Sequence, residues 1–251
     1  MAAGVLPIAH RGASGIAPEN TKVAFVMALD LGARAIEFDV QLTRDNVAIV
    51  FHDDTLDRTT NGAGSVADTD FSVIERLDAG AWFSDKYRRV EVPTLEEVLS
   101  SLRKRALLNI ELKPDARIER LVRHVVTAVA RFDLFDLAVF SSFDPDAIRI
   151  LRRLVPDARL GVLCMPDGIN EALRLAEDVA AENLHPPKSI VDEAFVRMAH
   201  DAGYNVWSWT ANTPADIERL VVAGVDGIFS DYVDRVRTIA VRTGRGVTGT
   251  R

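Results

Sequence analysis

Residues 36–54 read IEFDVQLTRDNVAIVFHDD, and the first part of this stretch has the pattern of a buried strand that carries acidic side chains. Glu37 and Asp39 alternate with apolar residues there. Successive side chains of a strand point to opposite faces, so the two carboxylates share one face and the apolar residues share the other. The pattern predicts a strand, buried in a sheet, that directs two carboxylates to a common point.

The second half of the same stretch predicts a hairpin. Residues 44–46, RDN, separate two apolar runs and form a turn signal between antiparallel strands. Pairing centred on this turn gives partners whose residue numbers sum to about 90. It places Phe51 opposite Asp39 and His52 opposite Phe38. We therefore expect the returning strand to bring His52 beside the two carboxylates.

Short apolar runs alternate with segments of helical periodicity along the whole chain, once the returning run VAIVFH of the hairpin is set aside. Such alternation predicts parallel strands covered by helices, and eight units match a (β/α)8 TIM barrel formed by residues 1–251 as one domain. A doubly wound open sheet is the alternative, but HRGASG after the first run is not a phosphate-binding glycine loop. Asn20 is the expected N-cap of the first helix. The eight predicted strands are 6–10, 35–40, 107–112, 137–142, 159–163, 183–185, 204–209 and 226–230.

Two segments do not fit the barrel repeat. Residues 53–92 follow the hairpin and are too long for an ordinary loop between a strand and a helix. Their aromatic residues predict a small packed insertion over the barrel mouth. Residues 243–251 are rich in Gly and Thr without an apolar pattern, so we expect a frayed tail.

Composition excludes several classes of protein. With 251 residues and 48% hydrophobic content the chain can bury a large core, and its net charge of −7 argues against nucleic-acid binding. The single cysteine, Cys164, excludes an internal disulfide. No run is long enough for a membrane span, and the N-terminal sequence has no signal-peptide pattern, so we expect a cytoplasmic protein without stable membrane insertion. The sequence makes no prediction of oligomeric state.

Three carboxylates are predicted to meet at the barrel mouth, because active sites of such barrels lie at the C-terminal ends of the strands. Glu37 and Asp39 come from the second strand, and Glu111 comes from the end of the third. Bare carboxylates repel one another, and an all-oxygen cluster suits a hard divalent cation, Mg²⁺ or Ca²⁺. The alternative is that each carboxylate pairs with an Arg or Lys side chain of the barrel.

Basic and imidazole side chains are predicted at the same mouth. His10 and His52 can share acid–base work near neutral pH. Arg11 and Lys113 supply positive charge for an anion, most naturally a phosphoryl group. Pairing of these two side chains with nearby carboxylates is compatible with that role.

Five motifs in combination resemble those of the glycerophosphodiester phosphodiesterase family, over about residues 6–240. The resemblance implies a (β/α)8 barrel with a small insertion after the second strand, and hydrolysis of small-molecule glycerophosphodiesters to glycerol 3-phosphate and an alcohol. The motifs are HRGASGIAPENT (10–21), IEFDVQLTRDNVAIVFHDDTLDRTTNG (36–62), IELK (110–113), WTAN (209–212) and GVDGIFSDYVD (224–234).

The resemblance also implies roles for individual residues. It implies that Trp209 lines the glycerol side of the pocket and that Glu19 supports the histidine and arginine of the first strand. The remaining roles are a divalent cation held by Glu37, Asp39 and Glu111, general acid–base catalysis by His10 and His52, and phosphate contacts from Arg11 and Lys113.

Three alternatives stay open. An amidohydrolase-type barrel would need a His-x-His on the first strand, where the sequence has only His10. A lysophospholipase D acting on lipid-bearing phosphodiesters would need an apolar insertion, whereas residues 53–92 carry many Asp residues. A phosphometabolite-binding barrel without catalysis would bind ligand and not turn it over. The sequence leaves open the alcohol leaving group, the choice between Mg²⁺ and Ca²⁺, which histidine is the acid, and whether a cyclic phosphate forms.

Overall fold

Eight parallel strands close into a barrel in the computed structural model, which describes residues 4–248. The hydrogen-bonded order is β1-β9-β8-β7-β6-β5-β4-β2, and pairing of β1 with β2 closes the ring. The predicted (β/α)8 barrel is thereby confirmed, and the open sheet is excluded. The strands are β1 Leu6–His10, β2 Ala35–Leu42, β4 Leu107–Leu112, β5 Ala138–Ser142, β6 Arg159–Leu163, β7 Asn183–His185, β8 Asn205–Ser208 and β9 Gly227–Ser230.

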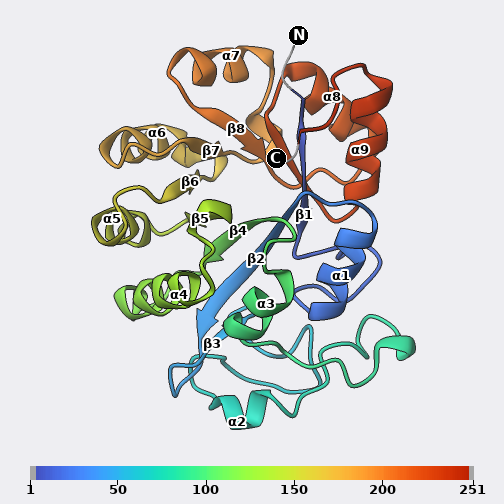
Figure 1. Ribbon diagram of the computed structural model, residues 1–251, viewed down its shortest axis with the longest axis vertical. Helices are drawn as coiled ribbons and strands as arrows, with labels where there is room; N and C mark the ends of the chain where they lie inside the picture. The colour runs from blue at the N-terminus through green and yellow to red at the C-terminus, as the bar shows by residue number, and fades with distance from the viewer. Residues whose placement is uncertain (1–3, 249–251) are drawn as a thin grey trace.

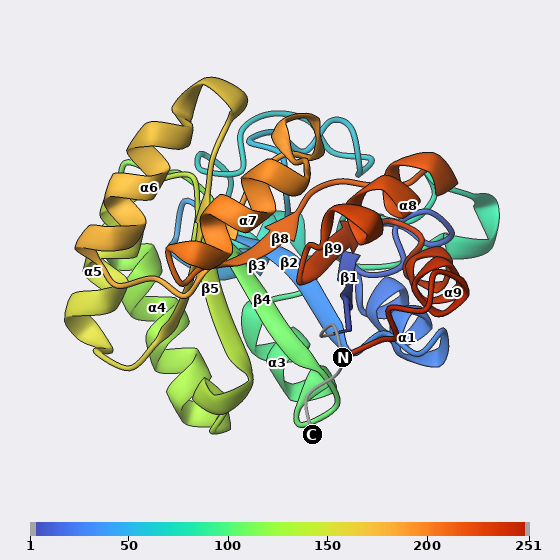
Figure 2. The same ribbon diagram turned by 90° about the horizontal axis from the view of Figure 1, so that it is seen from above.

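Helices follow each barrel strand and cover its outside (Figures 1 and 2). Figure 2 shows α4, α5 and α6 on one side of the strands and α1, α8 and α9 on the other. Several helices begin at a side-chain cap, such as the capping box of Thr94 and Glu97 at α3. The covering helices are α1 Lys22–Asp30, α3 Leu95–Leu102, α4 Ile118–Phe132, α5 Pro145–Leu154, α6 Ile169–Asp178, α7 Glu193–Asp201, α8 Pro214–Ala223 and α9 Val233–Arg242.

The interior of the barrel changes from apolar to polar along the strands. At their N-terminal ends Ala35 and Leu107 belong to an apolar cluster inside the barrel, together with Trp207 and Phe229. Residues two and four positions further along β2 and β4 share the same face and are polar. The closed N-terminal half of the barrel thus supports a polar mouth at the C-terminal ends of the strands.

The hairpin register agrees with the sequence prediction. Strand β3, Ala48–Val50, pairs antiparallel with β2, with Val40 opposite Val50 and Leu42 opposite Ala48. The numbers of each pair sum to 90. The backbone N–H of Phe51 then donates to the carbonyl of Asp39 at 3.0 Å, which carries the chain to His52 beside the acidic strand.

The segment between β3 and α3 packs with β3 around a small apolar cluster and lies at the lower edge of Figure 1. It contains α2, Phe71–Ile74, and the short helix η1, Asp85–Tyr87. The hydroxyl of Tyr87 donates to the carbonyl of Ile16 at 2.8 Å and so attaches this segment to the loop after β1. Division of the chain into one barrel domain with an insertion at 53–92 stays a prediction. The apolar cluster consists of Ile49, Phe51, Leu56, Val66, Ile74, Ala79 and Val92.

The predicted frayed tail is wrong for the part that the structure describes. Val247 forms a parallel bridge with Val5, and the N–H of Thr248 donates to the carbonyl of Val5 at 3.0 Å. These bonds extend the backbone pairing next to β1, so the tail needs no apolar pattern to be ordered there. Residues 249–251 lie outside the described residues.

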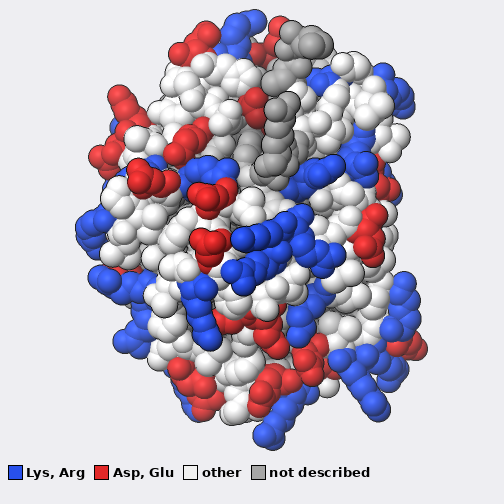
Figure 3. All heavy atoms as spheres, in the orientation of Figure 1, with Lys and Arg blue, Asp and Glu red and all other residues white. Residues whose placement is uncertain are grey.

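Charges of both signs are interspersed on the face shown in Figure 3, although Lys and Arg side chains gather near its middle. The net charge of −7 is therefore not spread evenly over this face. Within residues 4–248, no helix is both long and apolar enough to cross a membrane.

Candidate active site

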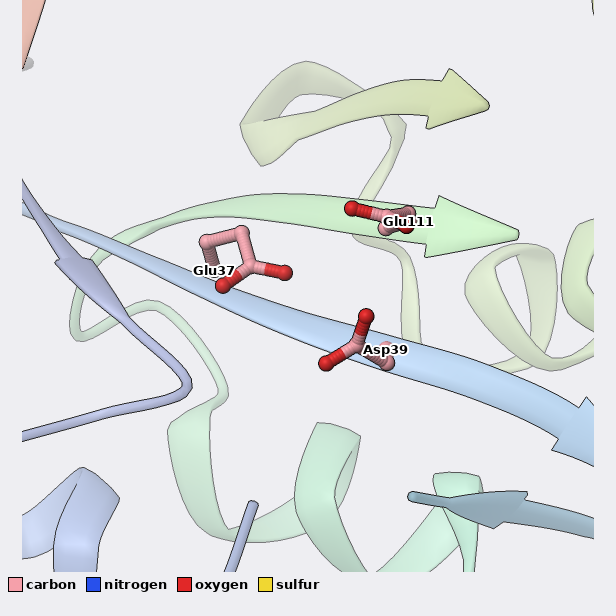
Figure 4. Close-up of side chains that lie close together, drawn as sticks. All are labelled: Glu37, Asp39 and Glu111. Carbon is pink, nitrogen blue, oxygen red and sulfur yellow. The ribbon is translucent and has the colours of Figure 1, made fainter. Parts of the chain in front are cut away.

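Three carboxylates converge at the barrel mouth, as predicted (Figure 4). Glu37 and Asp39 project from β2 and Glu111 from β4, where Asp39 lies level with Glu111 in the register. One oxygen from each lies within 4.8 Å of the others. Glu37 and Asp39 are fully buried, and the side chain of Glu111 is only 13% exposed. This spacing and burial fit a shared cation.

Mutual repulsion and burial disturb the ionisation of this cluster. Burial, and then the charges of Asp39 and Glu111, raise the pKa of Glu37 well above its ordinary value. Burial and Asp39 raise the pKa of Glu111 to about 7. Burial also acts to raise the pKa of Asp39, but Arg11 and Lys113 lower it below its ordinary value. In the absence of a cation, both glutamates therefore bind protons more readily than ordinary glutamates do.

Arg11 and Lys113 lie against the carboxylates. The Nζ of Lys113 lies 3.1 Å from Glu111 and 3.6 Å from Asp39, and the Nε of Arg11 lies 3.4 Å from Asp39. The alternative of ion pairing is therefore realised for Asp39 and Glu111. Glu37 differs, because its Oε2 accepts from the backbone N–H of Arg11 at 2.8 Å and its buried Oε1 has no partner within the described part of the chain.

Two residues of the loop after β1 have strained backbone conformations. Arg11 has φ 55° and Asn20 has φ 56°, in the left-handed region that non-glycine residues rarely adopt. The N–H of Asn20 donates to the carbonyl of Arg11 at 3.1 Å, which fixes the two residues together. This conformation directs the N–H of Arg11 to Glu37 and the amide of Asn20 to Asp39, with Nδ2 donating to Oδ2 at 2.8 Å.

The expectation that Asn20 caps the first helix is wrong. Thr21 is the N-cap of α1, and its hydroxyl accepts from the N–H of Ala24 at 3.3 Å. Both residues are good caps by type, so the sequence alone favours neither. The buried Asn20 amide instead donates to Asp39 on β2, a role that the sequence analysis missed.

Each pocket histidine is bound through Nδ1 to an aspartate. The Nδ1 of His10 lies 2.7 Å from Asp231, and the Nδ1 of His52 lies 2.6 Å from Asp53. A carboxylate only accepts, so these bonds hold the proton on Nδ1 and leave Nε2 for chemistry. Burial, together with the charges of Arg11 and Lys113, lowers the pKa of His52. The site therefore contains two oriented imidazoles.

The two aspartates were not identified as site residues from the sequence. In the sequence, Asp231 lies within the motif GVDGIFSDYVD (224–234), and Asp53 is the first residue of the segment 53–92. The amide of Asn212 donates to Asp231 at 2.6 Å. The only sequence signal for these partners is their place, directly after β9 and directly after His52.

A cavity of about 150 Å³ opens between the carboxylates and an aromatic wall. Trp209 belongs to that wall. Its Nε1 donates to the carbonyl of His185 at 2.7 Å, and its ring centroid lies 5.7 Å from that of Phe143 in an edge-to-face arrangement. His185 itself is fully buried and stacks on Trp207, outside the pocket lining. The lining residues are His10, Arg11, Glu37, His52, Asn109, Glu111, Lys113, Phe143, Leu163, Trp209, Thr210 and Phe229.

Known proteins resemble this chain over nearly its whole length. The model of the Glycerophosphoryl diester phosphodiesterase family matches residues 10–235. The chain is 37% identical to the glycerophosphodiester phosphodiesterase of Caldanaerobacter subterraneus, with 90% of this chain and 93% of that protein covered. The structure of a phosphodiesterase from Oleispira antarctica, in complex with the product sn-glycerol-3-phosphate, superimposes with a TM-score of 0.88 at 33% identity, covering 95% and 97% of the two chains. A putative glycerophosphoryl diester phosphodiesterase from Silicibacter pomeroyi gives a TM-score of 0.88 at 30% identity, covering 97% and 95%.

Proposed function

The chain belongs to the glycerophosphoryl diester phosphodiesterase family and is a glycerophosphodiester phosphodiesterase, and we propose that it works by metal-dependent, two-histidine catalysis. The substrates would be small glycerophosphodiesters, and the products would be glycerol 3-phosphate and an alcohol. The observation that carries this proposal is the meeting of three carboxylates, two basic side chains and two aspartate-bound histidines around one cavity.

The residues present fit a divalent cation. Glu37 Oε1 is buried without a hydrogen-bond partner in the described part, and leaving such an oxygen unpaired is costly. The donors are all carboxylate oxygens from Glu37, Asp39 and Glu111, which favours Mg²⁺ or Ca²⁺ over a softer metal. When bound, the cation would polarise a phosphoryl oxygen and neutralise charge on the phosphate.

Arg11 and Lys113 would bind the remaining phosphate charge. Both line the cavity and both stay protonated, since the surrounding acids raise their pKa values despite burial. Donors fixed before the reaction stabilise negative charge that develops on the phosphoryl oxygens. The aromatic wall around Trp209 would receive the carbon skeleton of the glycerol.

The two histidines would move the protons. One Nε2 accepts the proton of the attacking hydroxyl, from water or from the glycerol group, and the other donates a proton to the oxygen of the leaving alcohol. The lowered pKa of His52 keeps it unprotonated near neutral pH, which suits the accepting role. Asp53 and Asp231 would hold the rings and stabilise their protonated forms.

The test is release of glycerol 3-phosphate from glycerophosphocholine by EDTA-treated protein, before and after addition of Mg²⁺ or Ca²⁺. Removal of a general acid or base typically costs about 10²- to 10⁴-fold in rate, so His52→Ala should lose activity to that extent. His124→Ala is the matched control, because His124 is exposed on α4, outside the pocket lining, and its Nδ1 bonds to the carbonyl of Arg120.

Three results would contradict the proposal. Activity that survives EDTA would show that the carboxylate cluster is not a catalytic metal site. Full activity of His52→Ala would remove the two-histidine mechanism. Inactivity of the wild type on glycerophosphocholine, glycerophosphoethanolamine and glycerophosphoinositol would show that the substrates are lipid-bearing or otherwise different.

A further inference from the structure

Arg58 bridges two carboxylates at the edge of the active site without lining the cavity. Its Nη1 and Nη2 donate to the two oxygens of Glu19, each at 2.8 Å. Its Nε and Nη2 donate to the two oxygens of Asp53 at 2.6 and 2.8 Å. One guanidinium therefore makes four charge-assisted bonds, with a two-bond fork on each side.

Both carboxylates that Arg58 grips are themselves bound to residues of the pocket. Asp53 holds the Nδ1 of His52 at 2.6 Å, and Glu19 accepts from the Nη1 of Arg11 at 2.8 Å. The bonds form one continuous chain from the imidazole of His52 to the guanidinium of Arg11. Both of these end residues line the cavity.

The chain of bonds joins segments that are separate in the backbone. Glu19 lies in the loop between β1 and α1, and Asp53 follows β3 at the start of the segment 53–92. The strands that precede these two residues, β1 and β3, both pair with β2, whereas Glu19 and Asp53 lie beyond the strand ends. Strand pairing sets the backbone on each side, and the bonds of Arg58 link the side chains of His52 and Arg11 beyond the strand ends.

The positive charge of Arg58 favours the ionised forms of Asp53 and Glu19, the two carboxylates that it joins. Hydrogen bonds from Arg58 are the largest influence on the pKa of Asp53, which is lowered far below its ordinary value. The same guanidinium offsets the effect of burial on Glu19 and lowers its pKa as well. Without Arg58 two ionised carboxylates would face each other, and repulsion would separate them.

We propose that Arg58 is a positioning residue, which sets the imidazole of His52 and the guanidinium of Arg11 at the separation that the phosphodiester requires. This role rests on the proposed function of those two residues. A planar fork with five donors can grip two carboxylates at once, whereas a lysine ammonium is a point charge. The proposal therefore requires the shape of arginine as well as its charge.

The test compares Arg58→Gln and Arg58→Lys with Arg44→Gln. Arg44 is a matched control, because it also makes a two-bond pair with an aspartate, Asp70, on an exposed surface outside the pocket lining. We expect Arg58→Gln to lower kcat/KM on glycerophosphocholine by about 100-fold, since a displacement of about 1 Å can have that effect. Both kcat, through His52, and KM, through Arg11, should change. The kcat/KM of Arg58→Lys should exceed that of Arg58→Gln by less than tenfold, and the kcat/KM of Arg44→Gln should match that of the wild type.

A second measurement reports on the bonds without any turnover. In protein labelled with ¹⁵N-histidine, the Nδ1–H proton of His52 should give a downfield signal because of its short bond to Asp53. That signal should move or broaden in Arg58→Gln and stay in place in Arg44→Gln. The double variant Arg58→Gln/Asp53→Asn should lose little more activity than either single variant, because residues of one network are not additive.

Several results would overturn the inference. Arg58→Gln could show wild-type kinetics and an unchanged His52 signal, or Arg58→Lys could restore full kcat/KM. Arg44→Gln could lose as much activity as Arg58→Gln, or the activity losses of the two single variants could add up in the double variant. The proposed function fails separately, if His52→Ala keeps full activity. If His52→Ala is inactive while Arg58→Gln is normal, only the positioning role is wrong.

Discussion

Replacing Glu111 by Gln should stabilise the metal-free protein at alkaline pH, although it removes a proposed metal ligand. Gln has nearly the same shape and can still accept the bond that Lys113 donates to Glu111 at 3.1 Å. What the substitution removes is a negative charge that lies beside Asp39 in a buried site. The expected gain thus comes from relief of desolvation and repulsion.

The pKa of Glu111 gives the size and the sign of this effect. Burial and Asp39 raise it from 4.5 to about 7 in the folded protein, while the unfolded chain keeps the ordinary value. Between these two pH values the folded state binds a proton that the unfolded state has lost, so the free energy of unfolding decreases as pH rises. One pKa unit corresponds to about 1.4 kcal/mol, so wild type loses about 3 kcal/mol by about pH 8. The Gln variant cannot lose this amount.

Urea unfolding in EDTA measures the difference in the free energy of unfolding between Glu111→Gln and the wild type, at about pH 8 and at about pH 4.5. Glu111→Gln should exceed the wild type by up to about 3 kcal/mol at the higher pH and match it at the lower one. Adding Mg²⁺ at a hundredfold excess over its Kd should stabilise wild type by about 2.7 kcal/mol and the variant far less. Glu96→Gln, at an exposed position of α3, is the control and should show neither effect. Equal stability of Glu111→Gln and wild type at about pH 8, or lower stability of the variant, would refute the reasoning.

Two further substitutions test the surroundings of the site. Asn20→Ala removes the buried donor to Asp39, so it should lower the free energy of unfolding in urea by about 1–3 kcal/mol and weaken Mg²⁺ binding in a calorimetric titration. Unchanged Mg²⁺ affinity would show that Asn20 does not position Asp39. Gly161→Ala would place a Cβ 2.2 Å from Cε1 of the buried His185 and should lower the free energy of unfolding in urea by about 1–3 kcal/mol. Adding His185→Ala should restore part of this stability, and a single variant as stable as the wild type would contradict this packing.

The fold could be predicted because its determinants are local. Alternation of period two on β2 and β4 places the apolar and acidic residues on opposite faces, and the turn at 44–46 fixes the register of β3. The pocket residues that were predicted lie at strand ends, where the topology alone brings them together. Their placement required no knowledge of side-chain conformation. Their roles stay proposals.

The partners of those residues could not be predicted, because they depend on side-chain contacts between distant segments. Asp231 meets His10 across 221 positions of sequence, and Arg58 meets Glu19 across 39. Asn20 illustrates a second difficulty, since its left-handed backbone, and not its residue type, directs its amide to the acidic strand. No spacing rule in the sequence encodes that conformation.

The charge balance of the site explains why the cation and the protons should compete. Six carboxylates lie in or beside the site with three Arg and Lys side chains, so an anionic phosphodiester would meet net negative charge unless positive charge is added. The carboxylates are Glu19, Glu37, Asp39, Asp53, Glu111 and Asp231, and the basic side chains are Arg11, Arg58 and Lys113. The pKa of Glu111 is raised to about 7 and that of Glu37 is raised as well, so bound protons offset part of the negative charge as pH falls. A divalent cation would replace these protons, so its affinity should fall as pH falls toward and below about 7. Ionised Asp39, held between Arg11 and Lys113, is then the ligand that remains ready at every pH in this range.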